Sequence, residues 1–426
     1  MSKILIVGNG FDLRHFLPTK YNHFICLLRE IEAKNITNDL SFEEFFGNEF
    51  KNYDLFFYEK IKDFYYTDRL LFLKEELDGI KTKLKNNLWY RHFKSIDDSH
   101  IETWIDFETE INRVLVVIVR LFHTLDEIIK GDGKSFNGIF LNNKNSSYPY
   151  HFESLLSKRL LINLEIFKNI MGTDYLNEEY YFKIENKIQF IHENKILNNL
   201  YISLQEFTGI FNDFFLLIVS KFYNLFREER KENFLQKDEG SFEKLLSKID
   251  KIYSFNYTET IERLYLPKEI DFLHGKVVEN WINLEELKIV LGVDDLDQNL
   301  KKHKLFNFTK YFQKLHKQTD YQFLHNIYRM EAHTFYFWGH SLDISDKEYI
   351  REVFDQLHEK KSNLHDRFAL DSRIVIFYHS IQSKGDQINN LLSIIGKDEI
   401  EQLMKQKRLT FIQATEENLF KVLLKN

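Results

Sequence analysis

The first residues whose types and spacing could do chemistry form a glycine-rich turn close to the N-terminus. An apolar, strand-like stretch at residues 3–7 leads directly into this turn, and a helix-forming stretch follows it. The turn consists of Gly8, Asn9, Gly10, Phe11 and Asp12. Glycines here would let the backbone approach a pyrophosphate, and the helix N-terminus would offer N–H groups and a positive dipole end. Because Leu13 replaces the third glycine of the dinucleotide-binding fingerprint, the pattern also fits a plain strand–helix turn.

Two more polar residues stand directly after strand-like stretches. Asn256 follows residues 251–255, and His274 follows residues 270–273. Ligands of open α/β sheets bind outside the carboxyl ends of the strands, so both side chains are expected in the same crevice as the glycine turn. A histidine can act as a general base near neutral pH. Each residue also has a structural interpretation, Asn256 as a turn residue before the next helix and His274 as a core residue.

A fourth motif, Gly-His-Ser, ends another strand-like stretch at residues 334–338. Its Gly339 and Ser341 could form a second turn that contacts a phosphate or a ribose. The same residues could instead cap the helix that follows.

Other charged groups have simpler structural explanations. Asp106 and Glu108 precede a long amphipathic helix, and a capping box formed by Thr103 and Asp106 is favoured over catalysis. Six lysines alternate with aromatic residues at 301–317, a mixture that nucleic-acid binders also use. An exposed basic segment whose lysine stems cover apolar surface is favoured there. The 16 histidines show no spacing typical of a metal site, so no metal is expected.

Strand-like segments at the two ends of the chain must position these motifs. Runs of strand length rich in Ile, Val and Phe occur at residues 3–7, 251–255, 270–273, 288–291, 334–338, 373–378 and 409–412. Buried parallel strands have this composition. Between about residues 40 and 245 the pattern changes to helical periodicity, as at residues 111–128 and 200–226. Residues 131–147, rich in Asn, Ser and Gly, resemble a loop.

These patterns predict an α/β protein with a doubly wound, mostly parallel, Rossmann-like sheet and a large helical insertion after the first strand–helix unit. The first strand, loop and helix of the nucleotide-binding domain would occupy residues 1–40. The insertion would occupy residues 41–245, and residues 246–426 would complete the Rossmann-like domain.

Composition narrows the class of protein. The single cysteine, Cys26, excludes an intramolecular disulfide framework and a cysteine-rich zinc site. The longest apolar runs, such as residues 114–119 and 214–219, are far shorter than a membrane span, and no signal-peptide core precedes them. A cytoplasmic protein without a membrane partner is therefore expected. The net charge of −7 and the pI near 6.2 provide no positive field that would attract nucleic acid.

Taken in order, the motifs resemble the AbiH family of bacterial phage abortive-infection proteins. The resembling segments are residues 8–13, 17–21, 104–108, 255–258, 274–275 and 339–346, so the resemblance covers most of the chain. The opening Gly-Asn-Gly-Phe-Asp-Leu is the most specific of them, and Phe16 replaces the glycine that usually precedes Leu-Pro. The resemblance implies a phage-defence effector that a phage-encoded protein triggers, and its oligomeric state, a homo-oligomer included, stays open.

A more distant resemblance, to the sirtuin-like NAD-binding fold, suggests chemistry. The matching positions are Gly8, Gly10, Leu17, Pro18, Asn256, His274, Gly275, Gly339, Ser341 and Leu342. This resemblance implies NAD as substrate or ligand, held by the loops at residues 8–12 and 339–341. It implies that Asn256 positions a water or a ribose hydroxyl and that His274 is the general base. The paired zinc-binding cysteines of sirtuin deacylases are absent, which argues against protein deacylation, and Phe16 and Thr19 depart from the sirtuin loop.

Three hypotheses follow. The first is an NAD hydrolase that cleaves the nicotinamide–ribose bond when phage infection triggers it. The second is a regulatory module that binds a nucleotide without turnover. The third is a metal-dependent, nuclease-type toxin that uses Asp106, Glu108, Asp343 and Asp346.

Overall fold

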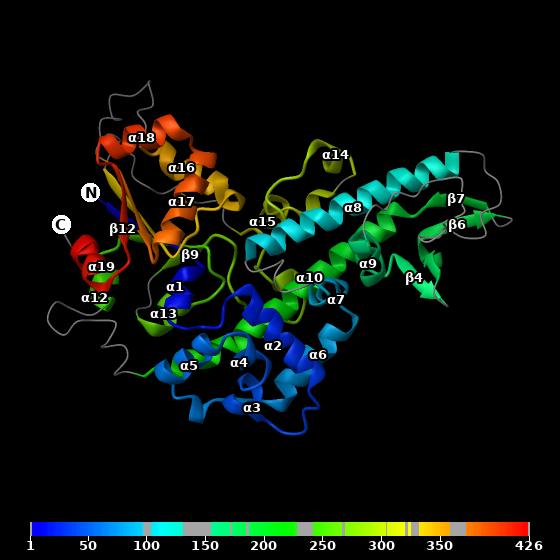
Figure 1. Cartoon of the computed structure of the whole chain (residues 1–426), viewed down its shortest axis with the longest axis horizontal. Coiled ribbons are helices and arrows are strands. Elements are labelled where there is room, and N and C mark those ends of the chain that lie inside the picture. The colour runs from blue at the N-terminus through cyan, green and yellow to red at the C-terminus, as the bar shows by residue number, and fades with distance from the viewer. Residues whose placement is uncertain are drawn as a thin grey trace.

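The computed structural model of the chain is built around one parallel β-sheet (Figure 1). It describes residues 2–96, 104–130, 155–170, 173–184, 187–227, 242–265, 269–303, 305–319, 323–324, 332–357 and 372–424. The strands of the sheet are β1 (Ser2–Val7), β8 (Lys251–Ser254), β9 (Ile270–Phe272), β10 (His333–Trp338), β11 (Arg373–Tyr378) and β12 (Leu409–Gln413). Their order is β12-β11-β10-β1-β8-β9, and all neighbours are parallel. The predicted α/β class with a parallel sheet is confirmed.

The direction in which strands are added to the sheet reverses at β1. After β1 the chain adds β8 and β9 on one side, then returns to place β10, β11 and β12 on the other. Val7 pairs with Ser254 on one neighbour and with Trp338 on the other, so the three central strands end at the same level. In open parallel sheets the crevice outside such a reversal is where ligands bind.

Helices cover both faces of the sheet, because alternate residues of the central strands are apolar in both directions. Ile4 and Ile6 pack on one face, and Leu5 and Val7 pack on the other. The helices on the first face are α16 (Lys347–Asp355), α17 (Ile381–Ile394) and α18 (Lys397–Lys405). Those on the second face are α1 (Asn9–Arg14), α12 (Phe242–Ser247), α13 (Thr260–Leu264) and α19 (Glu416–Leu423). Figure 1 shows the two groups on opposite sides of the strands.

A large helical region separates β1 from β8 in the sequence. Its helices are α2 (Tyr21–Ala33), α3 (Phe42–Phe46), α4 (Glu49–Tyr53), α5 (Leu55–Phe64), α6 (Lys74–Asn86), α7 (Leu88–Lys94), α8 (Trp104–Lys130), α9 (Leu155–Asn163) and α10 (Glu193–Leu217). It also contains three short antiparallel pairs, β2 (Leu40–Ser41) with β3 (Leu71–Phe72), β4 (Phe167–Ile170) with β5 (Thr173–Leu176), and β6 (Tyr181–Ile184) with β7 (Lys187–Ile191). The long helices α8 and α10 extend away from the sheet toward the β6–β7 pair (Figure 1).

Aromatic side chains form much of the core of this region. Phe24 of α2 packs edge-on against Phe207, Phe211 and Phe214 of α10, whose spacing places them on one face of the helix. The helix α2 therefore belongs by packing to the helical core and not to the sheet. The proposed domain boundaries at residues 40 and 245 stay a prediction.

The remaining elements are short. They are the helices α14 (Gln298–Lys301) and α15 (Lys310–Lys317) and the 3₁₀ turns η1 (Thr67–Arg69), η2 (Glu178–Tyr180), η3 (Val219–Leu225), η4 (Leu284–Glu286), η5 (Leu305–Phe308) and η6 (Ile344–Asp346). In the described part of the chain, one helix, α10 with η3, is long and apolar enough to cross a membrane. Because 78% of its most apolar window is buried inside the protein, it is packed as a core helix.

Two sequence predictions need correction. Residues 288–291 were predicted as a strand but are extended without joining the sheet, because the side chain of Gln313 replaces a neighbouring strand. Its Nε2 donates to the carbonyl of Leu291 at 2.7 Å, and the N–H of Leu291 donates back to its Oε1 at 3.2 Å. The lysines at 301–317 are not all exposed, since Lys310 and Lys317 are buried. The predicted loop at residues 131–147 and the capping residue Thr103 lie outside the described residues.

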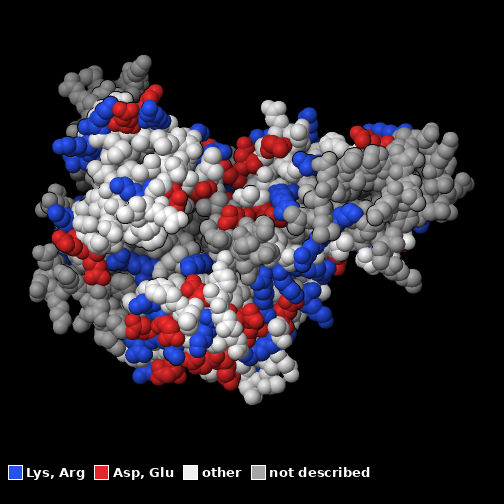
Figure 2. Space-filling view, in the orientation of Figure 1, with Lys and Arg blue, Asp and Glu red and all other residues white. Residues whose placement is uncertain are grey.

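Acidic and basic side chains are intermixed on the face of the molecule shown in Figure 2. In the lower part of this view, where Figure 1 places α3 to α6, lysines and arginines lie directly beside aspartates and glutamates. Among the described residues, this face has no continuous basic surface of the kind that nucleic-acid binding requires.

Candidate functional site

A cavity of about 490 Å³ opens outside the carboxyl ends of β1, β8 and β10. This volume lies within the range of small-molecule sites. Its walls come from the strand ends and from the helical region, which contributes Tyr21 and Asn22 of α2, Glu108 of α8 and Phe215 of α10. The cavity therefore lies where the sheet, at the reversal of its strand order, meets the helices.

Most of the residues singled out from the sequence line this one cavity. They are Gly8, Asn9, Gly10, Asp12, Asn256, His274, Gly339 and Ser341. The structure thus brings together four segments that are up to about 330 residues apart in the sequence. Phe11 is the exception, because its side chain is buried beneath the sheet and packs edge-on against Trp338 with ring centroids 5.0 Å apart.

The glycines have a structural reason that the sequence did not indicate. A Cβ added to Gly8 would lie 2.7 Å from the carbonyl oxygen of Gly339, and one added to Gly10 would lie 2.7 Å from the Cα of Gly339. The N–H of Gly10 donates to the Gly339 carbonyl at 2.8 Å, and that of Gly8 donates to the Trp338 carbonyl at 3.0 Å. The two loops are therefore joined through their backbones. A Gly10→Val variant would disturb this contact as well as any ligand.

Side chains, more than backbone N–H groups, must therefore recognise a ligand here. The N–H of Phe11 is also used internally, donating to the carbonyl of Gly8 at 2.9 Å. The helix α1 has only six residues, so its dipole is small. The Asn9 amide holds the loop in place, since its Nδ2 donates to the Thr19 carbonyl at 3.1 Å and its Oδ1 accepts from the Thr19 hydroxyl at 2.7 Å.

Asp12 is a carboxyl held in a nearly water-free position. It is 1% exposed, and one of its oxygens accepts a hydrogen bond from the Thr258 hydroxyl. Its other oxygen, Oδ1, has no hydrogen-bond partner among the described residues. Burial raises the pKa of Asp12 to about 7, although hydrogen bonds from Thr258, Thr260 and Asn256 act to lower it. Asn256 therefore belongs to the same polar network as the glycine turn.

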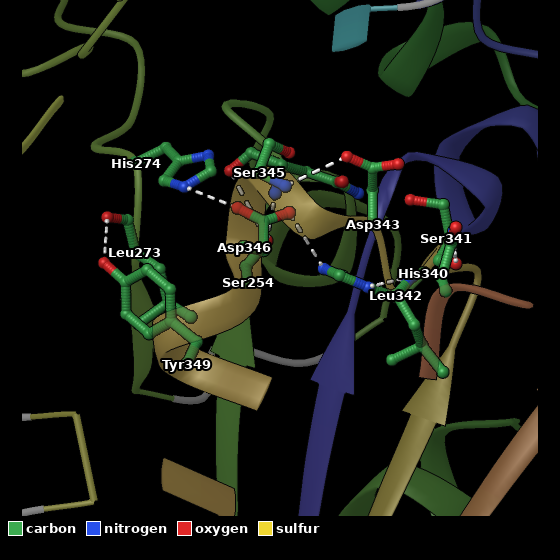
Figure 3. A network of polar contacts seen from close by, with 12 residues as sticks. Ser254, Leu273, His274, His340, Ser341, Leu342, Asp343, Ser345, Asp346 and Tyr349 are labelled. Atoms are coloured by element: carbon green, nitrogen blue, oxygen red, sulfur yellow. Dashed lines mark hydrogen bonds and ion pairs between the residues drawn. The ribbon is translucent and has the colours of Figure 1, made fainter. Parts of the chain in front are cut away.

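His274 faces a second carboxylate, Asp346, which also reaches His340 (Figure 3). The Nε2 of His274 lies 3.3 Å from Oδ1 of Asp346, and the Nε2 of His340 lies 3.4 Å from Oδ2. The first contact is an ion-pair distance without good hydrogen-bond alignment, since neither atom has a hydrogen-bond partner in the described structure. Asp346 stands at the start of α16, directly after η6, and so reaches both histidines from one position.

The charges of this group set the state of His274. Burial, and then the positive charges of Lys310 and Lys314, lower the pKa of His274 to about 3. The imidazole is therefore neutral at pH 7. Burial acts to raise the pKa of Asp346, but Lys310, His274 and His340 hold it well below its usual range. A neutral His274 beside an ionised Asp346 can exchange hydrogen bonds with a ligand, but it is a weak acceptor of a full proton.

Lys310 and Glu108 form a further pair in the cavity wall. The ammonium of Lys310 lies 2.6 Å from Oε1 of Glu108 and 3.9 Å from Oδ1 of Asp346, and the lysine is 4% exposed. Burial raises the pKa of Glu108 to about 7, even though Lys310 acts to lower it, and the charge of Asp346 adds to the rise. The capping interpretation of this segment overlooked Glu108. Its only sequence signal was its place in the Trp-x-Asp-Phe-Glu segment, and Lys310 had no signal beyond its lysine-rich surroundings.

The carboxylates proposed for a nuclease site do not come together. Asp343 accepts the N–H of Ser345 at 2.9 Å as the cap of η6, and neither it nor Asp106 lines the cavity. Glu108 and Asp346 do line the cavity, with the ammonium of Lys310 between them. Within the described ranges, no group of three or more His, Cys, Asp or Glu side chains is placed to hold a metal ion.

Comparison with known proteins agrees with the order of the motifs around this cavity. No curated protein and no solved structure matches the chain. A family model described as bacteriophage abortive infection AbiH matches residues 4–365, which include every segment that lines the cavity. The chain therefore belongs to the AbiH family of bacteriophage abortive-infection proteins.

Proposed function

We propose that this protein binds NAD or a closely related dinucleotide in the cavity and hydrolyses the bond between nicotinamide and ribose. The observation that carries the proposal is the convergence of the glycine turn, Asn256 and His274 at the reversal of the strand order. Numbered along the chain, the strands of the sheet follow the order 3-2-1-4-5-6, which is that of doubly wound dinucleotide-binding folds. This order supports a Rossmann-like, sirtuin-like assignment of the sheet.

The polar groups of the cavity suit this reaction. Cleavage passes through a transition state with positive charge on the ribose, so it needs a positioned water, an acceptor for its proton and nearby negative charge. Asn256 would position the water or a ribose hydroxyl, as the sirtuin-like resemblance implies. The neutral His274, oriented by Asp346, would hydrogen-bond the ribose or the water. The ionised Asp346 would stabilise the developing positive charge.

Membership of the AbiH family supports a role in abortive infection. Removal of NAD in the cytosol of an infected cell would stop growth before the phage completes its cycle. We therefore place the protein in the cytosol and propose a phage-encoded trigger as its partner. The buried packing of α10 agrees with a protein that stays out of the membrane.

Two alternatives remain, a regulatory module that binds the nucleotide without turnover and a nuclease-type toxin. The position of Lys310 between Glu108 and Asp346 favours the dinucleotide site over the nuclease, because the lysine already neutralises the two carboxylates that reach the cavity. The module and the hydrolase share the same site, so only turnover separates them.

The test is release of nicotinamide from NAD by the purified protein, with tRNA and DNA integrity followed in the same samples. We expect His274→Ala and Asn256→Ala to lower the rate about 10²- to 10⁴-fold while the protein stays folded. His92→Ala is the matched control, because His92 is equally buried but pairs with Glu110 at 2.8 Å, away from the cavity. Binding of NAD without nicotinamide release would favour the regulatory module. Metal-dependent loss of nucleic acid would favour the nuclease.

A further inference from the structure

Three carboxylates line the cavity in the described structure, and they differ in how far they are already engaged. Asp346 contacts His274, His340 and Lys310. Asp12 accepts a hydrogen bond from Thr258 and is 1% exposed, which keeps it from the open part of the cavity.

Glu108 is the most accessible of the three, with 17% of its side chain exposed against 12% for Asp346. One of its oxygens, Oε1, is held by Lys310 at 2.6 Å. The other, Oε2, is buried and has no hydrogen-bond partner among the described residues. An unsatisfied buried carboxylate oxygen is costly, so a bound water or substrate group is expected to complete it.

We propose that Glu108, supplied by the helical region, is the general base of the reaction and that Lys310 is its positioning residue. The step rests on the proposed function. The oxygen of a water molecule forms a bond to C1′ of the ribose, and the bond from C1′ to the nicotinamide nitrogen breaks. The electron pair of the broken bond leaves with nicotinamide, and one proton of the water passes to Glu108.

The geometry explains why this role does not fall to His274. Its Nε2 is directed at Asp346, and the surrounding lysines disfavour a positive charge on the ring. In Glu108, by contrast, Lys310 fixes one oxygen and leaves the other for the water. The reaction therefore divides between the two parts of the molecule, with binding groups at the strand ends and the proton acceptor on α8.

This assignment predicts a pH dependence. The charged and titratable groups that face Glu108 are Lys310, Asp346, Asp294 and Tyr257. The base must be ionised to accept a proton, and burial raises the pKa of Glu108 to about 7. Activity should therefore fall as the pH drops below about 7. Loss of the Lys310 charge should move this limb to higher pH, because that charge acts to lower the pKa of Glu108.

The decisive experiment measures NAD binding by calorimetry and nicotinamide release on the same variants. We expect Glu108→Gln to keep NAD affinity within a few-fold while kcat falls about 10²- to 10⁴-fold. Glu110→Gln is the matched control, because Glu110 lies on the same helix and is buried, but pairs with His92 and Arg113 outside the cavity. Lys310→Met should shift the acidic limb of kcat upward in pH, and Lys310→Arg should restore it.

The outcomes separate this inference from the proposed function. If the wild-type protein releases no nicotinamide, the proposed function fails. If the wild type is active and Glu108→Gln retains a rate within threefold of it, Glu108 is not the base and this inference is overturned. Should Glu108→Gln fold poorly, Glu108→Ala with added formate decides, since a small carboxylate should restore part of the rate. No rescue, together with an unshifted limb in Lys310→Met, would also overturn the assignment.

Discussion

Buried polar groups behave differently in the helical core and in the cavity wall. In the helical core, Asn212 donates from Nδ2 to the carbonyl of Val278 at 3.0 Å and accepts its N–H at 2.8 Å. Asn87 likewise satisfies both ends of its amide, with the Ser203 carbonyl and the N–H of Tyr90. These amides are structural, because each donor and acceptor has a partner within the protein.

In the cavity wall the same accounting fails. Asp12, Glu108, His274 and Asp346 each retain a buried atom without a hydrogen-bond partner in the described structure. Single unsatisfied atoms also occur elsewhere, such as Nε2 of Gln205, but four of them gather around this one cavity. The comparison teaches that the cavity has been left incomplete at a cost to stability, as binding sites commonly are.

The largest effect is expected where the two loops of the cavity touch. A Cβ on Gly339 would lie 2.3 Å from the backbone nitrogen of Phe11, and its φ of +68° is already unfavourable for an L-residue. Gly339→Ala should lower the free energy of unfolding by about 3–5 kcal/mol or prevent folding. Gly396→Ala is the control, because Gly396 has a φ of +97° but open space around it. It should cost only about 1–2 kcal/mol in urea unfolding, and equal costs would refute the loop-contact explanation.

The next effect tests the satisfied amides of the helical core. Asn212→Leu removes both hydrogen bonds to Val278 and leaves a buried N–H and a carbonyl without partners. We expect a loss of about 2–4 kcal/mol in urea unfolding. Asn198→Leu on the exposed side of the same helix should change the free energy of unfolding by less than about 0.5 kcal/mol. A similar small change at Asn212 would remove the contrast between the two regions.

The smallest effect has the opposite sign and depends on pH. The folded protein holds Asp12 protonated up to about pH 7, whereas the unfolded chain ionises it near pH 3.8. The wild type therefore loses stability as the pH rises between these values, and Asp12→Asn cannot. The variant should be more stable than the wild type by about 1–3 kcal/mol above pH 7, and the difference should shrink toward pH 4. Thermal unfolding of both proteins from pH 4 to 8 measures it, and a difference that does not change with pH would contradict the burial of Asp12.

The sequence predicted the cavity where chemistry coincided with the end of a strand. Gly8, Asn256, His274 and Ser341 could be found because each follows an apolar run, and parallel strands end at a common edge. Glu108 lies on a helix whose periodicity says which face is buried but not which polar residue faces a distant strand.

Other features depend on tertiary contacts that no local pattern encodes. Lys310 is buried because two carboxylates from other segments meet it, which its lysine-rich surroundings conceal. Residues 288–291 have the composition of a strand, yet a single glutamine side chain replaces the neighbouring strand. The hairpins β4–β5 and β6–β7 lie inside a segment that was expected to be helical.

The position of β1 at the centre of the sheet has a consequence for how the chain folds. Its partners begin at residues 251 and 333, so the first strand to leave the ribosome must wait for more than half of the chain. At ordinary synthesis rates this delay is on the order of tens of seconds. The helices between them make mostly local contacts and can form during that time. We expect the helical region to fold first and the apolar N-terminal strand to be the part of the nascent chain most in need of a chaperone.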